Sequence, residues 1–332
     1  MFRNPLTIGV DIGHHSIKAV VLRQKKSELE LVAFAEVVLS APVLNKQHSV
    51  NAPALLSAMR KLKKALPMGA RTTSLALPDS AVISKVVQLD SHLTEEESVF
   101  AVEQAISASS PFPVEELRLD FFPMMGDTFG EQSHTHPVQV YATRKETVDS
   151  RVAVMRQARL EPTVMELQTH ALVWLEQYLG EQQGVEGNWG IVDIGQTTTA
   201  IGIRGPAGSV YRREVSFGCE AMAQVDDAFS GSGDGTARAE QFTKQLADNL
   251  KRQIQLYSTT YPRSALQGIW LSGGGQNLII EEMLARMLSI SVRKLHPLSG
   301  FQRSAKLDLT LEEGGSGQYA VAAGLAIRGS SA

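Results

Sequence analysis

The sequence Val-Asp-Ile-Gly occurs twice, once in each half of the chain. Residues 7–22 read TIGVDIGHHSIKAVVL, and residues 190–203 read GIVDIGQTTTAIGI. In each copy an apolar run ends in these four residues, a few small or polar residues follow, and a second apolar run begins. This is the pattern of a strand, a tight turn and a returning strand. The repeat therefore predicts two similar halves whose hairpins face each other, with Asp11 on one side and Asp193 on the other.

The composition fits two domains of ordinary size and excludes several classes of protein. Of the 332 residues, 43% are hydrophobic, which is enough to fill two cores. The net charge of -3 gives no reason to expect a broad nucleic-acid-binding face, and a single cysteine, Cys219, excludes an internal disulfide framework. No apolar run approaches the roughly 20 residues that span a bilayer, and the first residues lack the apolar segment of a secretory leader. We therefore expect a cytoplasmic protein that binds no nucleic acid and does not itself insert into the membrane.

Hydrophobic periodicity predicts most of the helices. Apolar residues at helical spacing predict helices over 54–66, 163–179 and 237–257, and a further helix is expected over about 220–229. Thr94, with Glu97 three residues on, has the arrangement of a capping box at the start of another helix. The closing segment GGSGQYAVAAGLAIR predicts a helix of small residues that packs closely across the junction of the two halves.

The order of strands and helices changes after residue 80. Residues 81–160 predict the series strand, helix, strand, strand, helix, which suits a compact α+β unit inserted into the first half. We therefore assign 1–80 and 161–187 to a first domain and 81–160 to an inserted subdomain. The second domain takes 188–332 and includes a helical subdomain at about 219–267.

The repeated turn has the residues that a phosphate chain needs. Backbone N–H groups in a tight turn bind phosphate, and glycine allows a close approach, so Gly13 and Gly195 are candidates. Magnesium usually binds through waters, one or two carboxylates and the phosphates, a role that suits Asp11 and Asp193. Glycines on a strand-to-helix turn would let the backbone lie flat against a nucleoside. The further candidates for these contacts are Lys18, the hydroxyls of Ser16, Thr197, Thr198 and Thr199, and the turn at Gly273, Gly274 and Gly275.

Three motifs together resemble the superfamily of actin, sugar kinases and chaperone ATPases. They are VDIGHHSIKAV as phosphate-1, VDIGQTTTAIGI as phosphate-2 and WLSGGGQNL as the adenosine motif. The inserted subdomain resembles that of the cell-division protein FtsA and its relatives in the PilM family, which belongs to the type IV pilus machine. FtsA-like chains are longer and finish with an amphipathic membrane helix, whereas this sequence stops at AIRGSSA. The segments most similar to the PilM family are DIGHHSIKAV, ASSPFPVEELRLDF, YATRKETVDSRVAVMRQARLEP and LADNLKRQIQLY.

This resemblance implies an actin-like (ribonuclease H-like) two-domain α/β ATPase fold with an FtsA-type inserted α+β subdomain. It implies that ATP and magnesium bind between the domains, with further contacts from His14, His15, Gln196, Asn249 and Arg252. It also implies a groove, between the first-domain core and the inserted subdomain, that holds the N-terminal cytoplasmic tail of the inner-membrane protein PilN. Cytoplasmic pilus motor ATPases and a second copy of the chain are further partners that it suggests.

Two departures from the family pattern predict that ATP hydrolysis is weak or absent. Where the connecting helix often has two acids, this chain keeps Glu166 and has Gln168 at the other position. These two residues are the candidates for orienting the attacking water. In the long helix, Asn249 stands where an acid often lies near the nucleoside, while Arg252 keeps its basic partner.

Three functions fit the sequence. The first is a nucleotide-binding scaffold in which ATP closes the two domains and the closed form presents the partner groove. The second is a filament-forming ATPase like FtsA, and the third is a phosphotransferase of the sugar-kinase type, which should have an acidic base beside an acceptor pocket. We expect the first, located at the inner face of the bacterial inner membrane through a protein partner.

Overall fold

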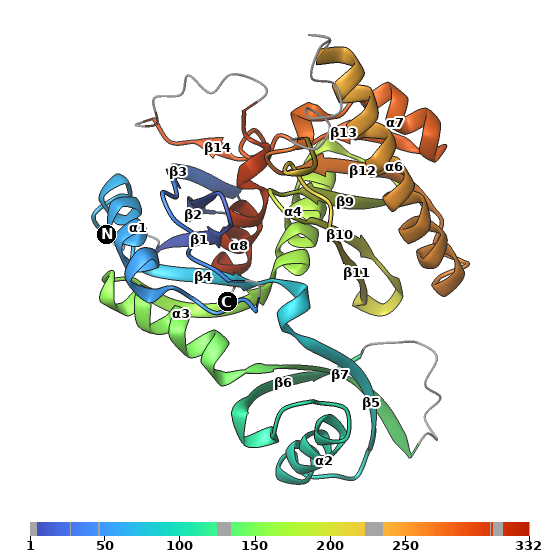
Figure 1. The fold of residues 1–332 in the computed structure, drawn as a ribbon. Helices are drawn as coiled ribbons and strands as arrows, with labels where there is room; N and C mark the ends of the chain where they lie inside the picture. The colour runs from blue at the N-terminus through green and yellow to red at the C-terminus, as the bar shows by residue number, and fades with distance from the viewer. Residues whose placement is uncertain are drawn as a thin grey trace.

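The computed structural model describes residues 5–26, 28–45, 47–124, 134–222, 235–305, 307 and 315–331. Two β-sheets lie on either side of a central pair of helices, and a smaller sheet with its own helix extends from one side (Figure 1). Among the described residues, no helix combines the length and the hydrophobicity that crossing a bilayer requires.

The first sheet has the strand order β14-β3-β2-β1-β4-β8. Its first three strands form an antiparallel meander, and two strands then add in parallel: β1 (Leu6–Ile12), β2 (Ser16–Lys25), β3 (Glu28–Val38), β4 (Thr72–Leu77) and β8 (Glu161–Leu167). One face is covered by α1 (Ala52–Ala65) and α3 (Lys145–Gln157). The helix predicted over 54–66 is α1, which begins after the side-chain cap Asn51.

The second sheet has the same plan, with the order β11-β10-β9-β12-β13. An antiparallel meander is again followed by two parallel strands: β9 (Asn188–Ile194), β10 (Thr199–Arg204), β11 (Val210–Val215), β12 (Leu266–Ser272) and β13 (Ser291–Lys294). One face packs against α6 (Gly235–Thr260) and α7 (Glu281–Leu288). The shared strand order confirms the two similar halves that the repeated hairpin predicted.

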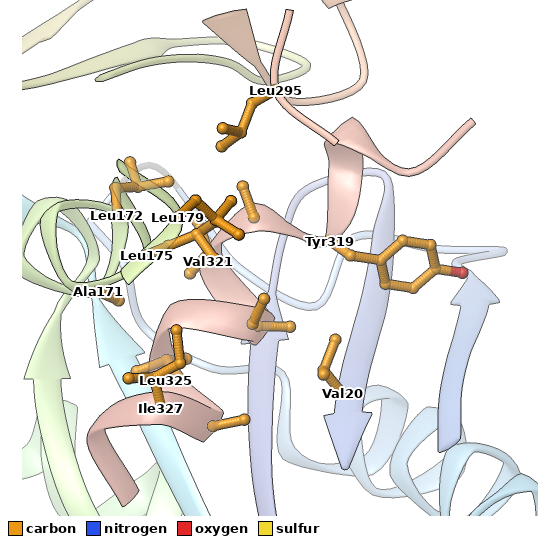
Figure 2. Close-up of a cluster of buried hydrophobic side chains, with 14 of the residues drawn as sticks. Val20, Ala171, Leu172, Leu175, Leu179, Leu295, Tyr319, Val321, Leu325 and Ile327 are labelled. Atoms are coloured by element: carbon orange, nitrogen blue, oxygen red, sulfur yellow. The ribbon is translucent and has the colours of Figure 1, made fainter. Parts of the chain in front are cut away.

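Two helices lie between the sheets, each against the sheet of the other half. The helix α4 (Gln168–Gln183) follows the first sheet but packs on β9 and β10, whereas α8 (Ala320–Ser330) follows the second sheet but packs on β1, β2 and β4. Figure 2 shows the side chains of α4 and α8 meeting in one hydrophobic cluster. The chain also returns to the first sheet through the two-residue strand β14 (Gln302–Arg303), which pairs with β3.

Small residues make this helix packing close. A Cβ on Gly324 of α8 would run into the backbone carbonyl of Ala171 on α4, and a Cβ on Gly9 of β1 would run into the backbone of α8. The prediction of a small-residue helix that packs closely at the junction is therefore confirmed.

The inserted unit between β4 and β8 has a sheet of its own, with the order β5-β7-β6. Its elements are β5 (Ile83–Asp90), α2 (Glu95–Ser107), β6 (Leu117–Pro123) and β7 (Thr135–Arg144), and the capping box of Thr94 and Glu97 is present at the start of α2. Packing of α2 on one face buries a separate small core that includes Val102, Ile106 and Val140. By contrast, α3 adds its buried side chains to the core of the first sheet.

Single-turn 3₁₀ helices lie at several connections. They are η1 (Asp79–Ala81), η2 (Val114–Glu116), η3 (Pro206–Gly208), η4 (Gln276–Leu278) and η5 (Gly317–Tyr319).

The helix predicted over 163–179 is wrong in its first part. Residues up to Leu167 form strand β8, and α4 begins only at Gln168. Pairing with β4 satisfies the backbone of β8, and its β-branched Thr163 and Val164 suit a strand. The helix predicted over 237–257 lies within α6. Most of the helix predicted over about 220–229 falls on residues outside the described ranges.

Candidate functional site

The two repeated turns are built alike. In the first hairpin the Gly13 N–H donates to the Ser16 carbonyl at 3.1 Å, and in the second the Gly195 N–H donates to the Thr198 carbonyl at 2.9 Å. The two glycine amides that the sequence suggested for phosphate binding therefore close their own turns. The tip positions are His14 and His15 in the first turn, both exposed, and Gln196 and Thr197 in the second.

The alternation of each strand turns both aspartates toward the central helices. Gly9 packs on α8, so Asp11, two residues later, lies on the same face of the first sheet. Ile191 belongs to the cluster around α4 and α8, and Asp193 follows it on the same face of the second sheet. Because α4 and α8 lie between the sheets, the two carboxylates approach each other from opposite sides.

Asp193 is 8% exposed, and its pKa is raised to about 6, chiefly because burial disfavours the charged carboxylate. The Ser272 hydroxyl, 2.8 Å from Asp193 Oδ1, acts in the opposite direction. The negative charge of Asp11 raises the pKa further, whereas Lys18 and the nearby Gln168 side chain lower it. Lys18 Nζ lies 3.4 Å from Asp11 Oδ2, so two carboxylates share one lysine. A divalent cation between them would relieve this excess of negative charge.

A buried hydroxyl beside these charges has no hydrogen-bond partner. Ser16 Oγ lies on the same face of β2 as Lys18, and within the described residues nothing bonds to it. A buried unpaired hydroxyl is costly, and a phosphate oxygen would satisfy it. The residues present thus fit a phosphate chain with its metal ion. The described residues contain no group of three or more metal-ligating side chains, so such an ion would depend on phosphate and water oxygens.

Thr199, another predicted phosphate contact, has a structural partner instead. Its side chain is fully buried, and its hydroxyl donates to the Phe217 carbonyl at 2.7 Å. The hydroxyl hydrogen therefore stabilises the base of the second turn. Thr198 accepts the turn-closing bond through its carbonyl and is only partly buried.

The triple-glycine turn lies beside the second hairpin turn. Gly273 has a φ of 85°, and a Cβ there would overlap the backbone of Ile194. The Gly273 N–H donates to the Gly317 carbonyl and the Gly275 N–H to the Ile194 carbonyl, both at 3.0 Å. Gly274 is exposed, with open space where a Cβ would be. The turn therefore exposes the backbone at Gly274 next to the site, and its contact with a nucleoside stays a prediction.

Some residues of the site were not found from the sequence. Ser272 pairs with Asp193 in strand register, and its position directly before the three glycines was the available signal. The N–H groups of Cys219 and Glu220 donate to the carbonyls of Gly195 and Gln196, both at 2.9 Å, so this segment supports the second turn. No local pattern marked it, because its partners come from another part of the chain.

The two candidates for orienting a water lie in different surroundings. Burial raises the pKa of Glu166, but the His170 side chain, the Leu167 N–H and Arg328 outweigh it, and the net pKa is lowered. His170 Nδ1 lies 3.2 Å from Glu166 Oε1, and Arg328 Nε lies 3.3 Å from Oε2. Glu166 is thus occupied by two basic partners. Gln168 is the candidate nearer the site, because its side chain is among the groups that lower the pKa of Asp193.

Asn249 and Arg252 lie on α6. The Asn249 side chain donates to the Gln245 carbonyl one turn earlier, at 3.0 Å, and Arg252 is exposed. Their contact with a nucleoside stays a prediction.

Comparisons with known proteins agree with this architecture. The sequence matches the family described as type IV pilus assembly protein PilM over residues 9–234 and 238–330. The fold is similar to that of a PilM-PilN type IV pilus biogenesis complex, at 22% identity and a TM-score of 0.80, with 98% of each chain covered. It is also similar to the ethanolamine utilization protein EutJ of Carboxydothermus hydrogenoformans, at 14% identity and a TM-score of 0.52, over 98% of this chain and 90% of that one. A diol dehydratase-reactivating factor aligns at 8% identity and a TM-score of 0.56, over 99% of this chain and 100% of that one. The actin-like α/β fold predicted from the sequence is confirmed.

Proposed function

The chain belongs to the PilM family of type IV pilus assembly proteins, and we propose that it works there as an ATP-binding scaffold. The observation that carries the proposal is the convergence of Asp11, Lys18, Gln168 and Asp193 between two turns of the same construction. In this proposal Lys18 and the Ser16 hydroxyl bind phosphate oxygens. Asp11 and Asp193 hold magnesium through water, and the ion neutralises the phosphate charge.

The nucleoside would lie against the triple-glycine turn. The exposed backbone at Gly274 supports this placement, since a flat ring can approach it without meeting a side chain. Asn249 and Arg252 on α6 are the proposed polar contacts. An amide such as Asn249 bonds a ribose hydroxyl more weakly than a carboxylate would.

We further propose that ATP is held rather than rapidly hydrolysed. Gln168, which reaches the site, can orient a water but cannot accept its proton. Glu166 could accept a proton, but His170 and Arg328 already stabilise its charged form. Hydrolysis would therefore lack an effective base.

The proposed partner is the N-terminal tail of PilN, and the similarity to a PilM-PilN complex supports this choice. We place this tail on the face of the inserted sheet that is opposite α2. Val86 and Phe122 are 48% and 47% exposed there, both beside Gln139, and the Phe122 ring lies 6.0 Å from that of Tyr141. We call Val86, Phe122 and Tyr141 the tail-binding face. An extended peptide with apolar side chains would cover them.

Such a scaffold would work in the cytoplasm at the inner face of the inner membrane. It would reach the membrane through PilN and link the alignment complex to the cytoplasmic motor ATPases. Self-association is a further proposed contact.

The test measures nucleotide and tail binding on the same protein. We expect ATP to bind with magnesium and turn over slowly, and a peptide copied from the PilN tail to bind as well. Asp11→Asn should weaken binding of ATP with magnesium at least about tenfold and leave binding in EDTA nearly unchanged. Asp90→Asn, an exposed aspartate at the end of β5, is the matched control.

The two competing functions predict different results. Steady phosphorylation of a small acceptor without peptide binding would overturn the scaffold in favour of a phosphotransferase. Sedimentation of the protein that depends on nucleotide would favour a filament-forming ATPase.

A further inference from the structure

An ion pair between Asp79 and Arg212 joins the three parts of the molecule. Asp79 lies in η1, between β4 and the inserted sheet, and η1 packs beside β11, which carries Arg212 (Figure 1). Arg212 Nη1 is 2.8 Å from Asp79 Oδ1, and the two side chains are only 14% and 11% exposed. Solvent screens such a pair little, so each charge depends strongly on the other.

On one side, Asp79 holds the first turn of α4. The Thr169 N–H donates to Asp79 Oδ2 at 3.2 Å, and the Thr169 hydroxyl donates to Oδ1 at 2.7 Å. A carboxylate at a helix N-terminus is a favourable arrangement. The preceding residue, Gln168, begins α4, and its side chain lies close enough to Asp193 to lower the pKa of that carboxyl. Asp79 therefore positions the helix end that reaches that site.

On the other side, Arg212 reaches the tail-binding face. Its guanidinium carbon lies 5.2 Å from the centroid of the Tyr141 ring, within range of a cation–π contact. The Tyr141 hydroxyl is 3.4 Å from His170 Nε2 on α4, and its ring is next to Phe122. A shift of the Arg212 guanidinium would therefore change the position of Tyr141, one of the residues proposed to hold the tail.

A second contact ties the same two elements together. The Ser80 hydroxyl donates to Glu214, two residues beyond Arg212, at 3.2 Å from Oε2. Strand alternation puts Arg212 and Glu214 on one side of β11, so both face η1. The strand is held to η1 at two points, and a movement of one element carries the other with it.

We propose that the Asp79–Arg212 pair couples the nucleotide site to the tail-binding face. This rests on the proposed function. Magnesium and ATP give Asp193 and Gln168 new partners, and the first turn of α4 moves with Gln168. Asp79 follows Thr169, the pair with Arg212 adjusts, and the position of Tyr141 changes. Nucleotide and tail then change each other's affinity by the same factor, as linkage requires.

The experiment measures this factor directly in the full-length chain. The dissociation constant of a labelled tail peptide is determined with and without saturating ATP and magnesium. We expect the two values to differ by roughly fivefold or more in the wild type and to become nearly equal in Arg212→Gln. The control is Arg213→Gln, since Arg213 lies over the Tyr211 ring on the same strand and should keep the wild-type factor.

Asp79→Asn and the double variant with Arg212→Gln complete a double-mutant cycle. The effects of the two substitutions on coupling should not add, because either one breaks the same pair. Hydrogen exchange provides a readout that needs no tail peptide. ATP with magnesium should alter exchange in β7 of the wild type and not of Arg212→Gln.

The outcomes separate the two proposals. If both ligands bind but the coupling factor is 1 in the wild type, or is unchanged in Arg212→Gln, the coupling is refuted and the proposed function stands. If the wild type binds neither ligand, the proposed function fails and the coupling fails with it. Thermal unfolding of each variant identifies any loss of folding, and Arg212→Gln alone decides the matter if Asp79→Asn does not fold.

Discussion

Ser272 donates a 2.8 Å hydrogen bond to Asp193 from the neighbouring parallel strand, at a position where the two residues are paired in register. Asp193 belongs to the second Val-Asp-Ile-Gly sequence, and Ser272 is the residue before the three glycines. One hydroxyl thus connects the predicted phosphate turn to the predicted nucleoside turn, and it does so where the carboxylate is almost fully buried.

Ser272→Ala should lower the free energy of unfolding by about 1–3 kcal/mol, because a buried carboxylate loses a donor. The measurement is denaturant unfolding of Ser272→Ala in the wild-type background and in Asp193→Ala. The loss should be much smaller where the carboxylate is already gone. An equal loss in both backgrounds would show that the hydroxyl acts through another contact. Ser258→Ala, on the exposed side of α6, is the control.

Phe122→Ala should weaken binding of the PilN tail peptide about tenfold, because an exposed aromatic anchor of the tail-binding face is removed. The matched control is Phe100→Ala. Phe100 is also an exposed phenylalanine of the inserted unit, but it lies on α2, away from that face. Titration with labelled peptide measures the effect. Equal losses for the two variants would contradict the assigned face.

The buried carboxyl of Glu176 should make the free energy of unfolding depend on pH. Its side chain is 3% exposed on α4, and Arg204 Nε lies 3.0 Å from its carboxylate. Burial raises its pKa from 4.5 to about 7, and Arg204 only partly opposes this shift. The folded state therefore binds the proton more tightly than the unfolded state. The free energy of unfolding should fall as pH rises from about 4.5 to about 7, by at most roughly 3 kcal/mol, and then level off.

Glu176→Gln should remove its own part of this dependence, leaving that of Asp193 and Glu214, whose pKa values are also raised, and should make the protein more stable than the wild type at pH 8. The change removes the buried charge, and Arg204, which is 40% exposed, can still be hydrated. Thermal unfolding across this pH range measures the effect, with the exposed Glu186→Gln as control. A variant that keeps the wild-type slope would assign the titration to another group.

Gly324→Ala should destabilise the protein by about 1–3 kcal/mol, since the added methyl group meets the Ala171 carbonyl. The direction of this change in stability is informative, because a change from glycine to alanine inside a helix ordinarily stabilises a protein by about 1 kcal/mol. Gly69→Ala is the control, as its Cβ would meet no atom within 4 Å. Unchanged or higher stability of Gly324→Ala would mean that the two helices can move apart at little cost.

Local patterns predicted the parts of the fold that depend on neighbours in sequence. The repeated hairpins, the capping box before α2 and the small residues of α8 were all visible in short stretches. Strand β8 was missed because its partner β4 lies some 90 residues earlier, as in the Glu166–Ala76 pairing. Its apolar residues also continue into α4 at a spacing that suits a helix. The two-residue strand β14 is too short for any periodicity.

The same limit applies to the candidate site. Asp11, Lys18 and Asp193 follow from the hairpin pattern, because the register of a tight hairpin fixes which residues share a face. The proximity of Gln168 to Asp193 depends on where α4 begins, which the sequence misplaced. Arg212 pairs with Asp79 only because β11 lies beside η1. No spacing in the sequence predicts that contact.

The exchange of α4 and α8 between the sheets makes the two halves mutually dependent. A fragment that ends between α4 and β9 would lack α8, and the other fragment would lack α4, so each would expose the apolar face of its own sheet. Each half has a complete strand order but lacks one of the helices that cover its sheet. The repeat in the sequence is therefore a repeat of pattern, while each of the two large sheets depends on a helix from the other half to cover one of its faces.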